Sequence, residues 1–302
     1  MTRTSSAGVL PAPPALPAVI ELLKPITWFP PMWAYLCGVV SAGQGFGDRW
    51  LECLAGVALA GPFVCGTSQA VNDWFDRHVD AINEPQRPIP SGRVGGRWGL
   101  GIAIAWTLVS MLLAALLGPV VFGAALIGLA LAWAYSAPPI RLKRNGWWGN
   151  AAVGFCYEGL PWFTGAAVMI GGMPSVPIIA LAILYSLGAH GIMVLNDFKS
   201  IEGDKRTGIA SLPVQLGVQG AARTACVVMI VPQLVVIALL VNWGHPLHAL
   251  GVSVLVAAQA LMMRRFLGNP LERAVWLSAG GVALYVIGML TSAFALATGA
   301  AS

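Results

Sequence analysis

The sequence predicts an all-α integral membrane protein, a bundle of nine transmembrane helices, and three observations support that prediction. Mean hydropathy is +0.76, and 10% of the 302 residues are charged, whereas soluble domains carry about 25%. Apolar runs of the ~20 residues that a spanning helix needs recur along the whole chain. Lysine and arginine also fall almost entirely in alternate loops between those runs.

The chain divides into a short tail and one membrane domain. Residues 1–20 are rich in Ala and Pro and lack a basic region followed by a cleavable apolar core, so we expect a flexible cytoplasmic tail. Residues 21–302 are expected to form a single membrane domain. Only Gly118 and Pro119 separate the third span from the fourth. The nine expected spans are, in order, 26–43, 51–71, 98–117, 120–135, 149–170, 178–195, 221–241, 248–263 and 274–297.

The basic residues also orient the bundle. Loops after odd-numbered spans hold only Arg49. The positive-inside rule therefore predicts that the N-terminus and every loop after an even-numbered span are cytoplasmic, with the C-terminus on the opposite side. Because the basic residues follow this topological pattern, the net charge of +5 does not indicate a nucleic-acid partner. The basic residues of the even loops are Arg77, Arg87, Arg93, Arg97, Arg141, Lys143, Arg144, Lys199, Lys205, Arg206, Arg264, Arg265 and Arg273.

The most polar window is residues 72–93, NDWFDRHVDAINEPQRPIPSGR. We call Asn72, Asp73, Asp76 and Asp80 the first acidic cluster. If the second helix continues into this window, these four side chains lie on one helical face, within an arc of about 100°. Carboxylates at a helix C-terminus repel one another and the helix dipole, so a cation among them is favoured. Oxygen ligands without Cys or His favour Mg²⁺ shared with substrate phosphates, and Arg87 and Arg93 suit the phosphate. The alternative is an ordinary solvated loop.

A second polar window, residues 196–213 with the sequence NDFKSIEGDKRTGIASLP, follows the sixth span. Its second acidic cluster is Asp197 and Asp204, which share a helical face if the helix persists, although Gly203 is a signal to end it. Lys199, Lys205 and Arg206 supply positive charge alongside. Four helices separate the two windows, so both lie on the same membrane face. Two facing acidic patches rimmed by basic residues predict a site for a diphosphate bridged by Mg²⁺, and the alternative for each patch alone is again a solvated loop.

These motifs resemble those of a known family. The pattern NDxxDxxxD in the first window, the later Asp cluster and the nine expected spans resemble the UbiA superfamily of intramembrane prenyltransferases. Within it, RPIPSG and NDFKSIEGD are most similar to the chlorophyll synthase branch, and to its bacteriochlorophyll synthases in particular. The resemblance covers essentially the whole membrane portion. The wider Asp spacing of the second motif departs from the quinone-pathway members, so the partner of Asp204 is less well determined.

The resemblance implies an activity, an Mg-dependent prenyl transfer. It implies that the propionate of bacteriochlorophyllide a is esterified by geranylgeranyl or phytyl diphosphate, with Mg²⁺ as cofactor and Mn²⁺ as its substitute, in a bacterial inner (intracytoplasmic photosynthetic) membrane. The acceptor carboxylate is already ionised near pH 7 and needs no general base. The residues carried over as catalytic are Asn72, Asp73, Asp76, Asp80, Asp197 and Asp204, and those for the metal are Asn72, Asp76, Asp80, Asp197 and Asp204. The cations available for the diphosphate are Arg87, Arg141, Lys143, Lys199, Lys205 and Arg206.

Two further features each have two interpretations. The loop 135–148, YSAPPIRLKRNGWW, is either a phosphate clamp through Arg141 and Lys143 or a positive-inside anchor with interfacial Trp residues. Glu158 and His190 lie deep in expected spans, where ionisable side chains are costly and suggest function. We expect Glu158 to contact the tetrapyrrole or a partner helix. His190 either ligates the Mg of the macrocycle or is structural.

Two rival functions remain open from the sequence. The first is a prenyltransferase of the same fold with another acceptor, namely plant-type chlorophyllide, a quinone precursor or haem. The second is a secondary transporter. Transporters place their polar residues near the membrane midplane, whereas the carboxylates of this sequence concentrate at one surface, so the transporter is disfavoured.

Overall fold

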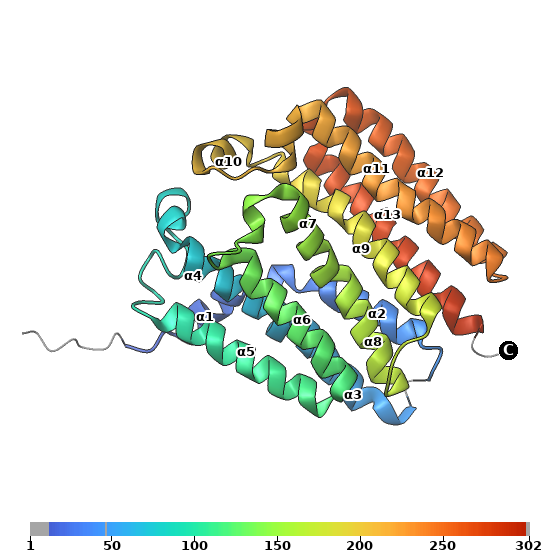
Figure 1. Ribbon diagram of the computed structural model, residues 1–302, viewed down its shortest axis with the longest axis horizontal. Helices are drawn as coiled ribbons and strands as arrows, with labels where there is room; N and C mark the ends of the chain where they lie inside the picture. The colour runs from blue at the N-terminus through green and yellow to red at the C-terminus, as the bar shows by residue number, and fades with distance from the viewer. Residues whose placement is uncertain (1–11, 46, 300–302) are drawn as a thin grey trace, which may run out of the picture.

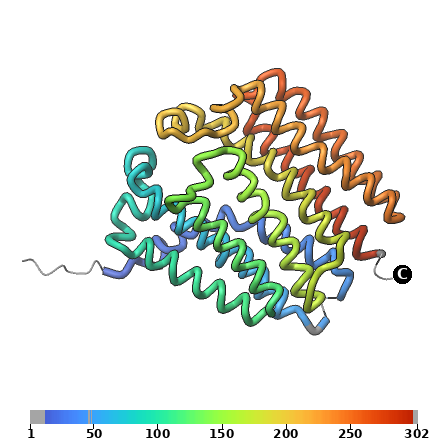
Figure 2. The backbone as a smooth tube through the Cα atoms, in the orientation of Figure 1, coloured from blue at the N-terminus to red at the C-terminus, as the bar shows by residue number. Residues whose placement is uncertain are grey.

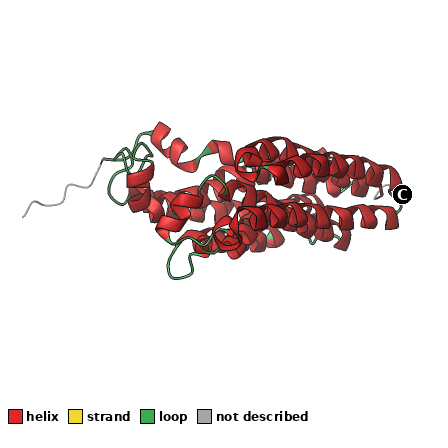
Figure 3. Cartoon of the chain, turned by 90° about the horizontal axis from the view of Figure 1, so that it is seen from above, coloured by secondary structure: helices red, strands yellow, loops and turns green. Residues whose placement is uncertain are grey.

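The structure is a computed structural model that describes residues 12–45 and 47–299. Within those ranges the chain is helical, apart from one isolated bridge between Asn145 and Ala210. The long helices run lengthwise along the molecule (Figure 1). Figure 3 shows most of the loops gathered at the end away from the C-terminus, and we call this the loop-rich end. The helix at residues 16–23 lies at the loop-rich end, and the last helix ends at the opposite end (Figure 2). Residues 29–41 pack against that last helix, where Trp33 Nε1 donates to the carbonyl of Val286 at 3.0 Å.

The first part of the chain contributes two long helices and a longer interrupted one. Pro62 lies in the π-helical turn η3, which joins α3 to α4 without ending the helix. The elements up to residue 136 are α1 (Leu16–Leu23), η1 (Pro25–Thr27), α2 (Phe29–Ser41), η2 (Gly47–Arg49), α3 (Trp50–Ala58), η3 (Leu59–Cys65), α4 (Gly66–Asn83), α5 (Trp98–Leu116) and α6 (Pro119–Ser136).

The second part begins with another helix interrupted by a π-helical turn, η5, and ends in three long helices. The elements from residue 142 onward are η4 (Leu142–Arg144), α7 (Gly146–Gly154), η5 (Phe155–Gly159), α8 (Leu160–Ile170), α9 (Val176–Asp197), α10 (Ile201–Thr207), α11 (Leu212–Asn242), α12 (Pro246–Gly268) and α13 (Pro270–Gly299).

Seven helical segments within the described ranges are long and apolar enough to cross a membrane. They correspond to all the expected spans except the first and the fifth. The helix at the first, α2, has 13 residues. The fifth runs continuously through α7, η5 and α8 and carries the polar residues Asn150 and Glu158, which make it less apolar. An all-helical membrane protein is therefore confirmed, whereas nine spans and the sidedness of the termini stay predictions.

Two of the sequence expectations about helix ends are corrected. The tail expected over 1–20 is shorter, because residues 16–20 belong to α1, whose buried Leu22 and Leu23 pack near α4; residues 1–11 lie outside the described part. The sixth helix does not persist to Asp204, because α9 ends at Asp197 and α10 starts afresh at Ile201. Gly203 lies inside α10 and does not end a helix.

The continuation of the second span is confirmed. The helix passes the expected end at Val71 and reaches Asn83, two residues before Pro85, so the first acidic cluster lies on its last turns. Behind it, α2 and α8 pack backbone to backbone. A Cβ at Gly38 would overlap the carbonyl of Trp162, and one at Gly165 would overlap the carbonyl of Tyr35. This close packing fixes α8 against α2, and η5 reaches α4 through the hydrogen bond from Gln69 to Tyr157.

Candidate active site

The first acidic cluster divides into two sides. On one side Asp73, which is 1% exposed, accepts from Lys24 Nζ at 2.7 Å and from Arg87 Nη1 at 3.3 Å. Arg87 Nη1 also contacts Asp80 Oδ2 at 2.9 Å, and Arg87 Nη2 forms an ion pair with Glu84. Asp73 and Asp80 therefore face α1 and the loop after α4, and one guanidinium links them.

The other side of the cluster faces α6 and the loop after it. Asp76 pairs with Arg141 Nη2 at 3.1 Å and with Lys143 Nζ. Asn72 Nδ2 donates to Asp76 Oδ2 and to Ser136 Oγ, each at 3.1 Å. The predicted phosphate clamp thus reaches the acidic cluster, and its two cations meet the carboxylate that the sequence placed at the centre of the motif.

Two of these cations have an unusual backbone. Lys24 (φ 48°) and Arg141 (φ 45°) are the non-glycine residues with positive φ in the described ranges. The left-handed region is unfavourable for a side chain with a Cβ and clusters at functional sites. Here it accompanies the ion pairs of Lys24 with Asp73 and of Arg141 with Asp76.

Lys143 is the most buried of the cations, with 9% of its side chain exposed. Burial lowers the pKa of its ammonium group below the usual lysine value, and the neighbouring Asp76 carboxylate opposes that shift. The ammonium therefore loses its proton at a lower pH than an exposed lysine does.

The second acidic cluster has different partners. Asp197 Oδ2 accepts from Asn150 Nδ2 at 3.0 Å, and Asp204 Oδ2 accepts from Ser200 Oγ at 2.9 Å. Among the residues that the structure describes, neither carboxylate has an ion-pair partner. The cations predicted beside them lie elsewhere, on exposed positions of α10 and the turn before it: Lys199, Lys205 and Arg206.

The two clusters nevertheless converge at the loop-rich end. The phenol of Tyr135, on the last turn of α6, interacts electrostatically with Asp76, Asp197 and Asp204. Asn72 and Asp197 line the mouth of one cavity together with Tyr135 and Asn150. The expectation that two polar windows 100 residues and more apart meet at one site is therefore consistent with their placement.

The oxygen ligands present suit a hard divalent cation. In the described ranges no three His, Cys, Asp or Glu side chains form a ready metal site. Mg²⁺ is usually held through one or two carboxylates, with substrate phosphates and water completing its shell. Asn72, Asp76, Asp197 and Asp204 offer that kind of incomplete oxygen shell, while the cations around Asp76 match the phosphate oxygens. The residues thus fit a metal that arrives with a diphosphate.

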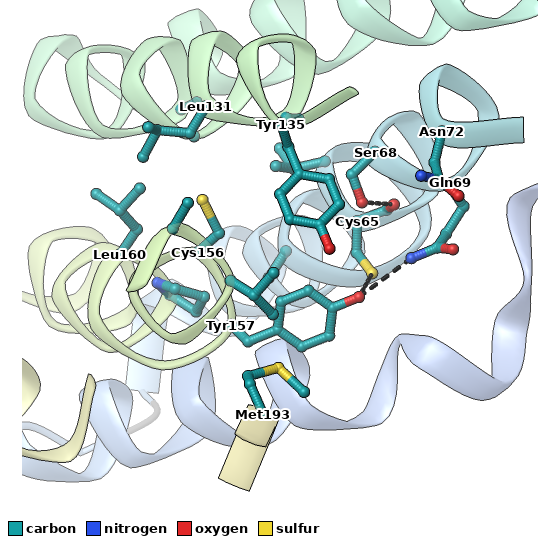
Figure 4. Close-up of a pocket in the computed structure, with 18 of the residues that line it drawn as sticks. Cys65, Ser68, Gln69, Asn72, Leu131, Tyr135, Cys156, Tyr157, Leu160 and Met193 are labelled. Atoms are coloured by element: carbon teal, nitrogen blue, oxygen red, sulfur yellow. Dashed lines mark hydrogen bonds between the residues drawn. The ribbon is translucent and has the colours of Figure 1, made fainter. Parts of the chain in front are cut away.

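A cavity of about 320 Å³ leads from this mouth into the bundle. It lies between η3 and α4, α6, η5 and α9 (Figure 4). Small and apolar residues such as Ala60, Ala124, Gly128 and Leu160 line its walls. Since Leu59 and Asn72 both line it and lie 13 residues apart on one helix, the cavity extends roughly 20 Å. Its shape and lining suit an apolar chain attached to a charged head.

One wall of the cavity is polar. Tyr157 Oη accepts from Gln69 Nε2 at 3.1 Å and from Cys65 Sγ at 3.5 Å. The thiol also lies near Thr27, whose Oγ1 is 3.5 Å from Cys65 Sγ. Figure 4 shows Cys65, Gln69, Tyr157 and Tyr135 directed into the cavity. Sequence reasoning missed Gln69, Tyr157 and Lys24, because isolated polar residues in or beside apolar helices carry no spacing signal.

The two deep ionisable residues do not line this cavity. Glu158 is 6% exposed, interacts electrostatically with Cys37 and Tyr285, and has a buried Oε2 without a hydrogen-bond partner in the described chain. His190 is 9% exposed, and its ring lies 5.7 Å from that of Trp147, with Nε2 buried and likewise unpartnered. Arg93 also lies apart from the acidic clusters, because it forms an exposed pair with Glu21.

Known proteins resemble the chain over most of its length. The sequence model of the UbiA prenyltransferase family matches residues 31–279. The bacteriochlorophyll synthase 33 kDa chain of Cereibacter sphaeroides is 57% identical over 279 residues, 92% of each chain. That of Rhodobacter capsulatus is 54% identical over 282 residues, 92% of this chain and 93% of the relative. The chloroplastic chlorophyll synthase of Oryza sativa is 38% identical over 290 residues, 91% of this chain and 76% of the relative.

Solved structures share the fold. A structure concerned with digeranylgeranylglyceryl phosphate synthase in membranes superposes with a TM-score of 0.73 at 20% identity, covering 92% of this chain and 98% of that one. A UbiA homolog from Archaeoglobus fulgidus bound to DMAPP and Mg²⁺ gives 0.68 at 17% identity, covering 93% and 99%. At such identities the likeness establishes the architecture of the bundle.

Proposed function

Because this chain belongs to the UbiA prenyltransferase family, we propose that it esterifies the propionate carboxylate of bacteriochlorophyllide with geranylgeranyl or phytyl diphosphate and releases diphosphate. The observation that carries the choice of acceptor is the order of identities. The bacteriochlorophyll synthases reach 57% and 54%, against 38% for the plant chlorophyll synthase. The shared membrane fold supports a prenyltransferase but does not distinguish between acceptors.

The site separates the substrate's charge from its chain. The diphosphate occupies the mouth, where Lys24, Arg87, Arg141 and Lys143 lie on one side and Asp197 and Asp204 on the other. The prenyl chain extends into the apolar cavity below. The residues that would hold Mg²⁺, or Mn²⁺ in its place, are Asn72, Asp76, Asp80, Asp197 and Asp204. Bound there, the ion supplies positive charge to the departing diphosphate.

The ion pairs of the first acidic cluster imply an exchange of partners on binding. Arg141 and Lys143 now contact Asp76, and Lys24 and Arg87 contact Asp73. When a diphosphate enters, these cations turn to phosphate oxygens, which would leave oxygens of Asp76 and of Asp80, the other partner of Arg87, free for a metal ion. Both carboxylates and cations stay paired before and after, so no uncompensated charge is left in a partly buried site.

The reaction itself needs no proton transfer. A carboxylate oxygen of the acceptor forms a bond to C1 of the prenyl group as the bond from C1 to the diphosphate oxygen breaks, and the electron pair leaves with the diphosphate. Fixed cations placed where negative charge grows stabilise the transition state more than the ground state. The apolar walls of the cavity keep water from the electron-poor allylic carbon.

The membrane arrangement follows from the same site. The loop-rich end carries both acidic clusters and most of the basic loops, so we place it in the cytoplasm, with the C-terminus on the far side and nine spans in all. Residues 21–302 then act as one membrane domain in a bacterial inner or intracytoplasmic membrane.

One assay tests this proposal. Purified protein with Mg²⁺ receives bacteriochlorophyllide and chlorophyllide in competition, each with geranylgeranyl or phytyl diphosphate. We expect prenylated bacteriochlorophyllide as the main product. Prenylated chlorophyllide, haem or quinone precursor in its place would transfer the proposal to that acceptor, and no transfer to any of them would refute it.

The contacts of the macrocycle are a separate proposal. His190 ligates the central Mg of the pigment after Trp147 moves off its ring, and Glu158 is a polar contact of the same substrate. His190→Phe should then weaken binding of the Mg-containing pigment and not of its Mg-free form, as measured by absorbance titration. Equal affinity of wild type and variant for both pigments would end this assignment.

A further inference from the structure

The polar wall of the cavity lies just below its mouth. Gln69 precedes Asn72 by three residues on α4, which places it about 4.5 Å deeper. Tyr157 reaches the same height from η5 and accepts hydrogen bonds from Gln69 at 3.1 Å and Cys65 at 3.5 Å. A geranylgeranyl or phytyl chain contains no hydrogen-bonding group at this depth. The polar wall is therefore built for something other than the chain.

The existing hydrogen bonds of Tyr157 determine whether its hydroxyl can donate to a ligand or accept from one. A phenol oxygen has one hydrogen to donate and lone pairs to accept with. Gln69 donates to this oxygen, and the one thiol hydrogen of Cys65 is shared between this oxygen at 3.5 Å and the Thr27 carbonyl at 3.4 Å. With an acceptor position already used by Gln69, the O–H is the group that can donate to a ligand. A donor hydrogen in an apolar cavity favours an acceptor, and most of all an anion, because an unmade hydrogen bond there is costly.

A second phenol faces the same space. Tyr135 lines the cavity from α6, and within the described ranges no group hydrogen-bonds to its hydroxyl. Of the described residues that line the cavity, none is Lys, Arg or His. An anion at this height would therefore be held by neutral donors alone. Neutral donors orient a carboxylate without pairing it to a fixed charge, so it keeps its nucleophilic lone pair.

We propose that Tyr157 and Tyr135 bind the acceptor carboxylate beside C1 of the prenyl group, and that Gln69 is a positioning residue that turns the Tyr157 hydroxyl toward it. This inference rests on the proposed function, which supplies a carboxylate as the nucleophile. The carboxylate thereby approaches C1 from the cavity side, while the diphosphate departs toward the cations at the mouth.

The test compares the free acid of the pigment with its propionate methyl ester. Both are titrated by absorbance into detergent-solubilised protein without any diphosphate. Wild type should bind the acid more tightly, because hydrogen bonds to charged groups are the stronger ones, and Tyr157→Phe should reduce that preference by about tenfold. Gln69→Leu should reduce it in the same direction while leaving the phenol in place.

Tyr185→Phe is the matched control. It removes a buried tyrosine hydroxyl that bonds Ser292 at 2.8 Å, away from the cavity lining, so it should keep the wild-type preference for the acid. If Tyr157→Phe does not purify, Tyr135→Phe carries the same expectation.

Two results would overturn the inference. One is an unchanged acid preference in Tyr157→Phe. The other is a rise in KM for the diphosphate alone, which would make the phenol part of the prenyl wall. Failure of the proposed function appears separately, as absence of ester in wild type supplied with pigment acid, Mg²⁺ and a C20 diphosphate.

Discussion

The two acidic clusters look alike in the sequence and differ in their partners. Each opens with Asn-Asp and has basic residues nearby. In the structure, the carboxylates of the first are paired with Lys24, Arg87, Arg141 and Lys143. Those of the second accept from neutral donors, namely Asn150, Ser200 and the backbone N–H of Leu212, and have no ion-pair partner in the described part of the chain. The first cluster is compensated within the protein, whereas the second is left to be compensated by what binds.

This difference separates two roles that an acidic cluster can have, stabilising the fold and binding a ligand. The ion pairs of the first cluster tie α1, α4 and the loop after α6 together, so its carboxylates contribute to stability as well as to binding. The second cluster adds negative charge to the mouth, and under the proposed function its cation is Mg²⁺ that arrives with the substrate. Substitutions in the two clusters should therefore differ in stability and agree in activity.

The largest expected effect is on turnover. Asp76→Ala and Asp204→Ala should each lower kcat by roughly a thousandfold, because each removes an oxygen ligand from the charge-stabilising machinery. Ester formation at saturating Mg²⁺ measures it, and a chelator should act in the same way on wild type. Near wild-type turnover in either variant would remove that residue from the site.

The clamp should respond more weakly. Arg141→Ala removes one of the two cations at Asp76 and should raise the KM for the prenyl diphosphate, or lower kcat, by about ten- to a hundredfold. Steady-state kinetics with the diphosphate varied provide the measurement. A variant that keeps its kinetics and changes only its membrane orientation would establish the anchor interpretation in its place.

Stability should distinguish the clusters directly. Asp73→Asn leaves Lys24 without its carboxylate and should lower the free energy of unfolding by about 1–3 kcal/mol. Asp197→Asn removes a carboxylate that has no cation partner in the described chain and should leave stability unchanged or raise it. Thermal unfolding in detergent without Mg²⁺ compares them. Equal losses in both variants would contradict the difference between the clusters.

The smallest effect concerns pH. Burial lowers the pKa of Lys143, so on raising the pH its ammonium deprotonates before an exposed lysine would. The contact with the diphosphate weakens as the pH rises through that lowered pKa, and the KM for the diphosphate should increase. Lys143→Arg keeps its charge there, so its KM should stay level over the same range. A parallel rise in both proteins would exclude Lys143 as the titrating group.

The sequence by itself determined the helices and the end at which the polar residues gather. Hydropathy and helix-ending residues act locally, so α5, α6 and α9 lie close to their expected ranges. The polar windows also predicted Asp76, Asp197 and Asp204 as site residues. The helical repeat accounts for the shared face of the first cluster on α4, whereas α9 ends at Asp197 and Asp204 lies on α10. The family resemblance extended this to a diphosphate site.

Only the tertiary structure decided which charge meets which. Lys24 and Asp73 lie 49 residues apart in the chain, and Gln69 and Tyr157 lie 88 apart. It also placed Lys199, Lys205 and Arg206, three cations predicted for the diphosphate, on exposed positions around α10 and not in ion pairs with the two acidic clusters. The pairing of charged side chains across helices depends on how those helices pack and on the direction of the side chains in the loops between them. Hydropathy and local spacing carry no information about either, since the same apolar pattern is compatible with many packings.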